Sequence, residues 1–269
     1  MGKIIVLGSA NAVAGLEQEN THLLFTAGER VVLVDCGSSP IPRLRRLGVD
    51  PLRLTDLILT HFHPDHVAGA PLLLMDLWLL GRREPLHVYG LADVTDRLQA
   101  MMDLYNWKRW PDFYPVVFHV LPAEEMTPVV ADEALSVWAS PVRHLIPTVG
   151  LRVQFHASGK AAAYSCDTEP CPAVVGLASG AQLLLHESAG QQTGHSSPAQ
   201  AGEIARKAGV EALYLIHYDT TLEEAELTAA AAETFGKPVQ LAKDFMEFEL
   251  ESGGRLPAVQ VGFPLEIFF

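Results

Sequence analysis

The sequence lacks several features that would indicate particular classes of protein. Its 269 residues contain three cysteines, Cys36, Cys166 and Cys171, which is an odd number without CxxC spacing. Structural disulfides are therefore not expected, and a reducing cytoplasm is the default location. No stretch reaches the roughly 18 uncharged apolar residues that a membrane helix needs. The first residues are typical of a core strand and not of a signal peptide.

Basic residues are also scarce. The chain has 19 Lys and Arg against 32 Asp and Glu, a formal net charge of −13, which argues against a broad nucleic-acid surface. Loop 8–15 is rich in small residues but lacks the Gly-Lys-Ser/Thr ending of a phosphate-binding P-loop. No linker, repeat or low-complexity segment divides the chain. We therefore predict a single domain over residues 1–269.

Potential metal ligands are concentrated in one stretch, Thr60-His61-Phe62-His63-Pro64-Asp65-His66. It follows the apolar run 54–59, which is typical of a buried strand, and Pro64 is a favourable first residue for a helix. Imidazole and carboxylate groups are the usual ligands of zinc and its first-row neighbours. Solvated surface histidines rarely form such a cluster, so we predict a metal site.

Three more candidate ligands lie far along the chain. They are His144, Asp167 and His217, and two of the three follow apolar runs typical of strands. The HxHxDH pattern after a strand, followed by this ordered set, resembles the metal motif of the metallo-β-lactamase superfamily. The resemblance implies an α/β (α+β) fold, the αββα sandwich, with two packed mixed β-sheets flanked by helices.

Further motifs resemble the ribonuclease Z branch of this superfamily. They are Asp167-Thr168, His186-Glu187, Gly194-His195-Ser196 and the segment from Leu80-Gly81-Arg82 to Tyr89-Gly90. The resemblance implies that one metal ion binds His61, His63 and His144, and that a second binds Asp65, His66 and His217. It also implies that Asp167 bridges both ions and that Glu187 and His195 form an accessory pair near the leaving group.

Two departures from this branch concern the substrate. Ribonuclease Z enzymes carry a long tRNA-gripping arm, commonly inserted between the positions of His144 and Asp167. Here those residues are 167 − 144 = 23 positions apart, which leaves room for a hairpin only. The branch also has an Arg-Tyr pair shortly after its last metal histidine, whereas this chain has Tyr218-Asp219. Both departures argue against tRNA processing.

An aromatic and basic segment over residues 105–114 supplies tentative substrate contacts. These are Trp107, Lys108, Arg109, Trp110 and Tyr114. The segment is either a lid over the site or an edge of the core, and the sequence does not favour one interpretation over the other. For His22, His87, His119 and His156 a structural role is favoured, because each lies in a strand-like context without ligand spacing.

These residues predict a dinuclear metal-dependent hydrolase that cleaves a small phosphodiester or related ester by means of a metal-bound hydroxide. Asp65 would orient that hydroxide, and His195, held by Glu187, would protonate the leaving group. A capping and core hydrogen-bond role is the alternative for this pair. We expect two divalent ions, zinc in the first instance, although manganese or iron also suits these ligands.

Other functions stay open at this stage. The alternatives are tRNA 3′-end processing, an arylsulfatase-type sulfuric ester hydrolase, and a non-catalytic binding protein that keeps the fold. The intact ligand set argues against the last of these. As partners we expect a small-molecule ester and no membrane, with nucleic acid disfavoured and a homodimer left open.

Overall fold

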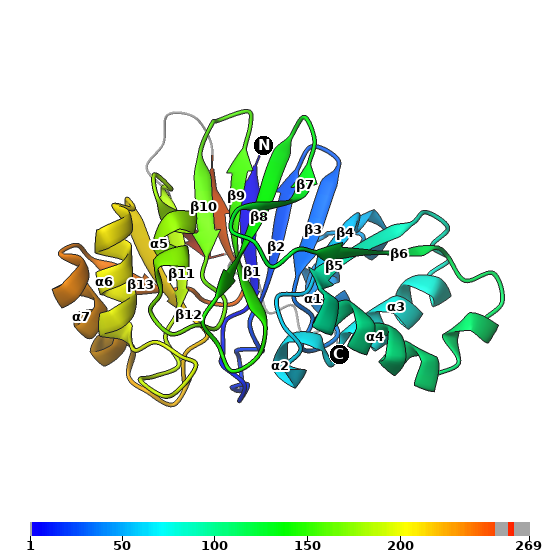
Figure 1. Cartoon of the computed structure of the whole chain (residues 1–269), viewed down its shortest axis with the longest axis horizontal. Coiled ribbons are helices and arrows are strands. Elements are labelled where there is room, and N and C mark those ends of the chain that lie inside the picture. Colours follow the sequence, from blue (N-terminus) through cyan, green and yellow to red (C-terminus); the bar gives the residue numbers. More distant parts are fainter. Residues whose placement is uncertain (1, 251–257, 261–269) are drawn as a thin grey trace, which may run out of the picture.

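The structure is a computed structural model that describes residues 2–250 and 258–260 of the chain. Two mixed β-sheets pack face to face, and helices cover the outer face of each sheet (Figure 1). This arrangement is the αββα sandwich that the sequence predicts. In the described part of the chain, no helix has the length and apolar character needed to span a bilayer.

In the described residues, the first sheet has eight strands in the order β15-β14-β1-β2-β3-β4-β5-β6. Their bounds are β1 Lys3–Gly8, β2 His22–Ala27, β3 Arg30–Val34, β4 Asp56–Ile58, β5 Leu86–Leu91, β6 Val116–Leu121, β14 Met246–Glu249 and β15 Ala258–Gln260. Strands β3 to β6 pair in parallel, whereas β14, β1, β2 and β3 pair antiparallel. The parallel strands therefore present their carboxyl ends at one edge.

The second sheet has seven described strands in the order β13-β12-β11-β10-β9-β8-β7. Their bounds are β7 Thr127–Ala131, β8 Leu135–Val142, β9 Thr148–Phe155, β10 Ala161–Tyr164, β11 Leu183–Glu187, β12 Ala212–Ile216 and β13 Val239–Leu241. Strands β10 to β13 are parallel to one another, and β7 to β10 are antiparallel. The carboxyl ends of β10, β11 and β12 consequently lie side by side.

The helices form the two outer layers (Figure 1). Their bounds are α1 Ile41–Arg46, η1 Pro51–Arg53, α2 Pro64–Val67, α3 Ala70–Leu79, α4 Ala92–Leu104, η2 Trp107–Arg109, α5 Pro172–Ala178, α6 Pro198–Ala208 and α7 Glu224–Phe235. One apolar cluster joins the first sheet to α1, α3 and α4, and another joins the second sheet to α5, α6 and α7. Each sheet thus buries its outer face under its own helices.

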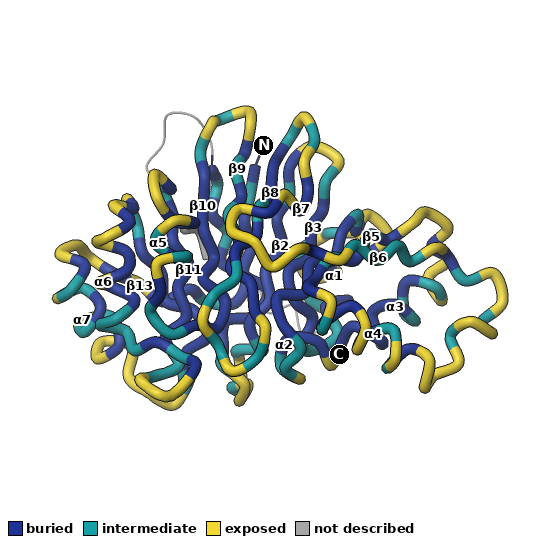
Figure 2. Tube along the Cα trace, in the orientation of Figure 1, coloured by how far each residue is buried: buried dark blue, intermediate teal, exposed yellow. Residues whose placement is uncertain are grey.

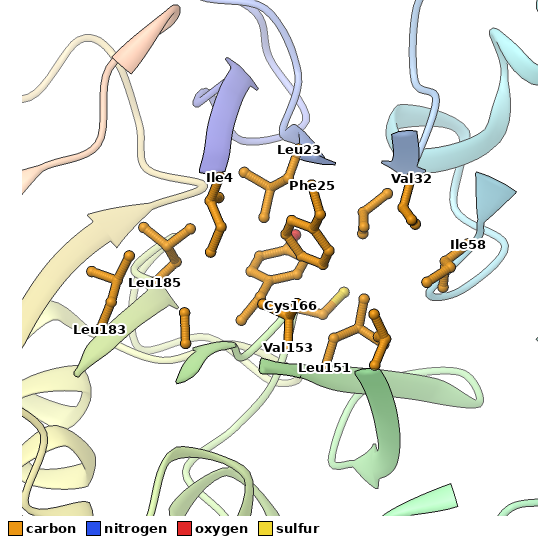
Figure 3. Packing of buried hydrophobic residues seen from close by; sticks show 14 of the residues in the cluster. Ile4, Leu23, Phe25, Val32, Ile58, Leu151, Val153, Cys166, Leu183 and Leu185 are labelled. Carbon is orange, nitrogen blue, oxygen red and sulfur yellow. The ribbon is translucent and has the colours of Figure 1, made fainter. Parts of the chain in front are cut away.

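The main core lies between the two sheets. Side chains such as Ile4 and Phe25 of the first sheet meet Leu151, Val153 and Leu185 of the second (Figure 3). Most strands are dark, buried segments in Figure 2, with the edge strand β6 an exception, and exposure concentrates in the connecting loops. Because such interiors are close-packed, the sandwich is a rigid base for the loops at the ends of its strands.

Residues 67–80 are apolar on nearly every side, a pattern that predicts one buried helix, and the structure differs from this prediction. The chain forms the short α2, then α3, with Gly69 at the break. The Gly69 amide donates to the carbonyl oxygen of Cys36 at 2.8 Å and not within the helix, and a Cβ atom on Gly69 would lie 2.2 Å from the carbonyl oxygen of Ser38, so only glycine fits at this break. Helix α3 is also not fully buried, since Leu79 is 65% exposed.

Candidate metal centre

The HxHxDH stretch lies where β4 gives way to α2. Strand β4 ends at Ile58, His61 and His63 lie in the irregular segment that follows, and α2 begins at Pro64. Proline suits this first helical position because its missing N–H would have no partner there. Asp65 and His66 therefore lie in the first helical turn, directly after the two histidines.

The second sheet supplies the remaining candidates from the ends of its strands. His144 follows β8, Asp167 follows β10 and His217 follows β12, while Glu187 is the last residue of β11. The parallel pairing of β10, β11 and β12 brings three of these residues to one edge. This edge faces the HxHxDH stretch, so ligands distant in sequence converge between the two sheets.

Three imidazole rings form the first candidate site. His61 Nε2 and His144 Nε2 each lie 3.1 Å from His63 Nδ1. Asp167 Oδ2 lies 3.9 Å from His61 Nε2 and 4.0 Å from His144 Nε2. One ligand atom from each of these four residues lies within 4.8 Å of the others, close enough to hold a metal ion.

The second candidate site adjoins the first. His66 Nε2 and His217 Nε2 each lie 3.4 Å from Asp65 Oδ2 and 3.5 Å from Asp167 Oδ1. The two oxygen atoms of Asp167 thus face different groups of histidines. This is the arrangement expected of a carboxylate shared between two cations.

The hydrogen-bond pattern of the rings fits bound cations. His144 Nδ1 lies 2.6 Å from the carbonyl oxygen of Gly194, and His66 Nδ1 lies 2.8 Å from Asp35 Oδ2. Each Nδ1 atom therefore carries the proton, which leaves a lone pair on Nε2. His66 Nε2 faces Asp167 Oδ1, and neither atom has a hydrogen-bond partner among the described residues. Either a metal ion or a second ring proton must lie between them, and the raised pKa of His66 shows that this position favours positive charge.

Burial and charge act in opposite directions on these groups. Burial alone would raise the pKa of the Asp65 and Asp167 carboxyl groups, but the neighbouring His217 and His66 rings hold both values well below the ordinary one. Burial would lower the pKa of His66, yet Asp167 and Asp35 raise it well above its usual value. The carboxylates are therefore kept ionised, as metal ligands must be.

The accessory pair lies beside this centre. His195 Nδ1 lies 3.2 Å from Glu187 Oε1, and its ring is 5.0 Å from that of His144 and 5.8 Å from that of His217. Burial raises the pKa of Glu187, although His195 opposes the shift. Burial would lower the pKa of His195, but the hydrogen bond that its ring donates to Glu187 outweighs this effect, and the net shift is upward. His195 thus retains its proton to a higher pH than a free imidazole.

Sequence reasoning missed the residues that support the ligands. Asp35 follows β3 and accepts hydrogen bonds from His66 Nδ1 and from the amide and hydroxyl groups of Thr60. Thr60 Oγ1 lies 3.1 Å from His61 Nδ1 and accepts from the Cys166 thiol at 3.0 Å. The sequence signal that could have identified Asp35 is its place as an acidic residue at the end of an apolar strand. Cys166 is fully buried, as expected of a packing residue.

The aromatic and basic segment 105–114 lies elsewhere. Trp110 stacks on Trp78 of α3 at 5.1 Å, and the Tyr114 hydroxyl donates to the carbonyl oxygen of Leu74. Lys108 pairs with Asp103 at 2.8 Å. Among the described residues, no hydrogen bond, ion pair or ring contact joins this segment, Arg109 included, to the candidate metal residues. The placement favours an edge of the core over a lid, and the proposed substrate contacts gain no support.

The residues after His217 also have local partners. The Tyr218 hydroxyl is buried and donates to the carbonyl oxygen of Ala242 at 3.0 Å. The Asp219 carboxylate accepts from the amide and hydroxyl groups of Thr221 at 2.9 and 2.6 Å. This loop therefore contributes turn structure after the strand, and neither side chain supplies a cation for a phosphate group.

Comparison with known proteins agrees with this geometry. A family model described as "Beta-lactamase superfamily domain" matches residues 30–218, which include all seven candidate metal residues. Ribonuclease Z from Mycobacterium sp. (strain KMS) is 31% identical in an alignment that covers 94% of this chain and 98% of the relative. The alignment has 285 positions, of which this chain fills about 253, or 94% of its 269 residues. The relative therefore has about 32 residues at positions where this chain has a gap.

Solved structures share the fold at lower identity. The metallo-beta-lactamase fold protein YhfI from Bacillus subtilis superposes with a TM-score of 0.76 at 22% identity, covering 92% of this chain and 98% of YhfI. A diphosphatase of the PhnP family superposes with a TM-score of 0.73 at 17% identity, covering 94% of this chain and 99% of the diphosphatase. Both likenesses extend over nearly the whole chain.

Proposed function

The chain belongs to the metallo-β-lactamase superfamily, in its ribonuclease Z-like branch, and from this we propose that it is a metal-dependent phosphodiesterase. The observation that carries the proposal is the Asp167 carboxylate, whose two oxygen atoms face two separate groups of ligands. Divalent ions bound at both groups would activate water and polarise the phosphoryl group of a diester. Zinc suits the histidine-rich ligand set, and manganese or iron is compatible with it.

His195 and Glu187 would act on the leaving group. His195 lies against the rings of His144 and His217 and so borders both candidate sites. Its raised pKa suits a group that donates a proton to a departing alkoxide near neutral pH. Glu187 accepts at Nδ1 of His195, which leaves Nε2 available for the substrate. Asp65 is placed to orient the attacking water as well as to bind metal.

The size of the substrate depends on the segment between His144 and Asp167. That segment contains only β9, a tight turn over residues 156–160, and β10. No arm is present there to hold tRNA at a distance from the cut, and the net charge of −13 opposes a polyanion. These features favour a small diester.

A second candidate substrate is precursor tRNA. The comparison with ribonuclease Z from Mycobacterium favours it, because the identity extends over 94% of this chain. Phosphodiester cleavage is common to both leading candidates, so the reaction can be tested separately from the substrate.

The deciding experiment uses one preparation of the enzyme on two substrates. We expect the metal-loaded enzyme to cleave bis(p-nitrophenyl) phosphate. His63→Ala should lose this activity, because it removes the Nδ1 atom that lies beside the Nε2 atoms of both His61 and His144. We expect precursor tRNA to be cleaved poorly at physiological salt. Accurate 3′ trimming at nanomolar enzyme would establish the tRNA function instead. If the metal-loaded enzyme cleaves neither bis(p-nitrophenyl) phosphate nor precursor tRNA, the phosphodiesterase proposal is contradicted.

A further inference from the structure

The backbone at Gly194 packs directly against a candidate metal ligand. Its carbonyl oxygen lies 2.6 Å from His144 Nδ1, and a Cβ atom on this residue would lie 3.0 Å from the same nitrogen and 2.9 Å from Leu145 Cγ. Gly194 also has φ +87, a conformation that other residues rarely adopt. This peptide therefore fixes the orientation of the His144 ring, and the next residue is His195.

Glu169 holds the preceding peptide unit, which ends at the Gly194 amide. Its Oε1 atom accepts the amide proton of Gly194 at 3.0 Å. Its own amide donates to the carbonyl oxygen of Arg143 at 2.7 Å, one residue before His144. Glu169 also follows Asp167 by two residues. One side chain thus connects the loop carrying His195 to the segments that carry two candidate metal ligands.

The hydrogen bond, and not the charge of Glu169, accounts for this role. The nearest cation is the Arg143 guanidinium, whose Nη1 atom lies 3.9 Å from Oε2, and the Arg143 side chain is 65% exposed. Such exposed ion pairs contribute little. The bond to Gly194 is partly buried and acts on a turn in which His195 donates its amide proton to Gln192.

We propose that Glu169 is a positioning residue that acts through Gly194 on two groups at once. Its bond to the Gly194 amide aligns the carbonyl that orients His144 for metal binding, and it places His195 for proton donation. The second effect rests on the proposed phosphodiesterase function, whereas the first concerns metal affinity alone. The two effects are therefore measurable independently.

The test compares three variants of the full chain. Glu169→Ala removes the acceptor, Glu169→Gln keeps an oxygen acceptor without charge, and Arg143→Ala removes only the ion pair. We expect Glu169→Ala to weaken the affinity for the metal ion near His144 by roughly 10–100-fold, the usual effect of losing a partner behind a ligand. Glu169→Gln and Arg143→Ala should stay within about threefold of wild type. Competition with a chromogenic chelator measures this affinity without any turnover.

The kinetic arm compares diesters with good and poor leaving groups. Glu169→Ala should slow cleavage of the diester with the poor leaving group roughly tenfold more than cleavage of the p-nitrophenyl diester. The difference should appear in kcat, and KM should change little. His195→Ala sets the upper limit, since proton donors contribute about 10²–10⁴-fold. If Glu169→Ala does not fold, Glu169→Asp replaces it, because its shorter side chain retracts the acceptor from Gly194.

Three results would overturn the proposal. They are unchanged metal affinity in Glu169→Ala, equal rate loss for good and poor leaving groups, or a Glu169→Gln variant as impaired as Glu169→Ala. Inactive wild-type enzyme would contradict the phosphodiesterase function, and the metal-affinity measurement would still decide the role of Glu169 at His144.

Discussion

The buried histidines of this protein divide into two kinds at the scale of single residues. Those of the candidate metal centre have a ring nitrogen that faces carboxylates, as His66 does. His22 and His186 are equally buried but lie in strands with only a backbone carbonyl oxygen at Nδ1. Burial lowers the pKa of each to about 4, so their charged forms are incompatible with the native interior.

His186 should therefore make the protein sensitive to acid. Its pKa falls from about 6.5 in the unfolded chain to about 4 in the folded one, so the unfolded state binds the proton first. Stability is complete above about pH 6.5 and declines as the pH falls towards 4, by about 3 kcal/mol in total. Denaturant titrations of wild type and His186→Gln at several pH values measure this contribution.

The difference in the free energy of unfolding between wild type and His186→Gln reports on His186 alone, because acid-induced metal loss affects both proteins. We expect the stability advantage of wild type to shrink as the pH falls from 7 to 4.5. Parallel stability curves across this range would mean that His186 is not the titrating group.

The grouping of the seven candidate metal residues could be predicted from the sequence because most of them follow apolar runs typical of strands and their order resembles a known metal motif. Asp35 and Glu169 could not be assigned in this way. Their effect depends on which backbone amides and imidazole nitrogens lie opposite them, as Gly194 does for Glu169. Such partners are separated by 25 residues or more and depend on how the strands are placed in the sheets.

At the scale of elements, helix α6 begins shortly after His195 of the accessory pair. Ser197 caps the helix by accepting from the amide of Gln200, while the Gln200 side chain accepts from the amide of Ser197. This capping box begins two residues after His195. Helix propensity and the Ser-Pro start were sufficient to predict α6 from the sequence.

Removing the cap should destabilise the protein modestly. Ser197→Ala leaves the Gln200 amide without its acceptor, which costs about 1 kcal/mol and should lower the melting temperature by roughly 2–4 °C in a chain of this size. Ser197→Thr keeps the oxygen and is the matched control. Differential scanning calorimetry compares the three proteins, and equal losses for Ala and Thr would rule out the cap as the cause.

Other elements could be predicted only in part. The strands around Val32 and Leu184 were clear because both faces are covered and the residues are continuously apolar. The break between α2 and α3 was not, because it depends on the close approach of Gly69 to the loop at Ser38. That contact joins residues 31 positions apart and leaves no local signature in the hydrophobic pattern.

At the scale of the whole molecule, the candidate metal centre lies between the two sheets. The HxHxDH stretch follows a strand of the first sheet, and His144, Asp167 and His217 follow strands of the second. Bound cations would therefore connect the two layers. Binding to the native state alone stabilises a protein by about 4 kcal/mol when the ligand exceeds its Kd a thousandfold.

Chelation should consequently lower the melting temperature of the whole sandwich by several degrees. We expect thermal unfolding with excess chelator to begin earlier than with metal, and re-addition of metal to restore it. His63→Ala, which lacks a ligand, should respond much less to the chelator. A melting temperature independent of metal would mean that the centre does not hold the layers together.

The turn between β9 and β10 has a consequence for protein engineering. Strand β9 starts beside His144 and β10 ends beside Asp167, so the turn over residues 156–160 lies at the far end of both strands from the centre (Figure 1). A reporter domain or affinity tag inserted at 158–159 would project away from bound substrate. A chimera meant to recruit a larger substrate would instead need its graft at residues 145–147, which directly follow the candidate ligand His144 and begin with the exposed Leu145.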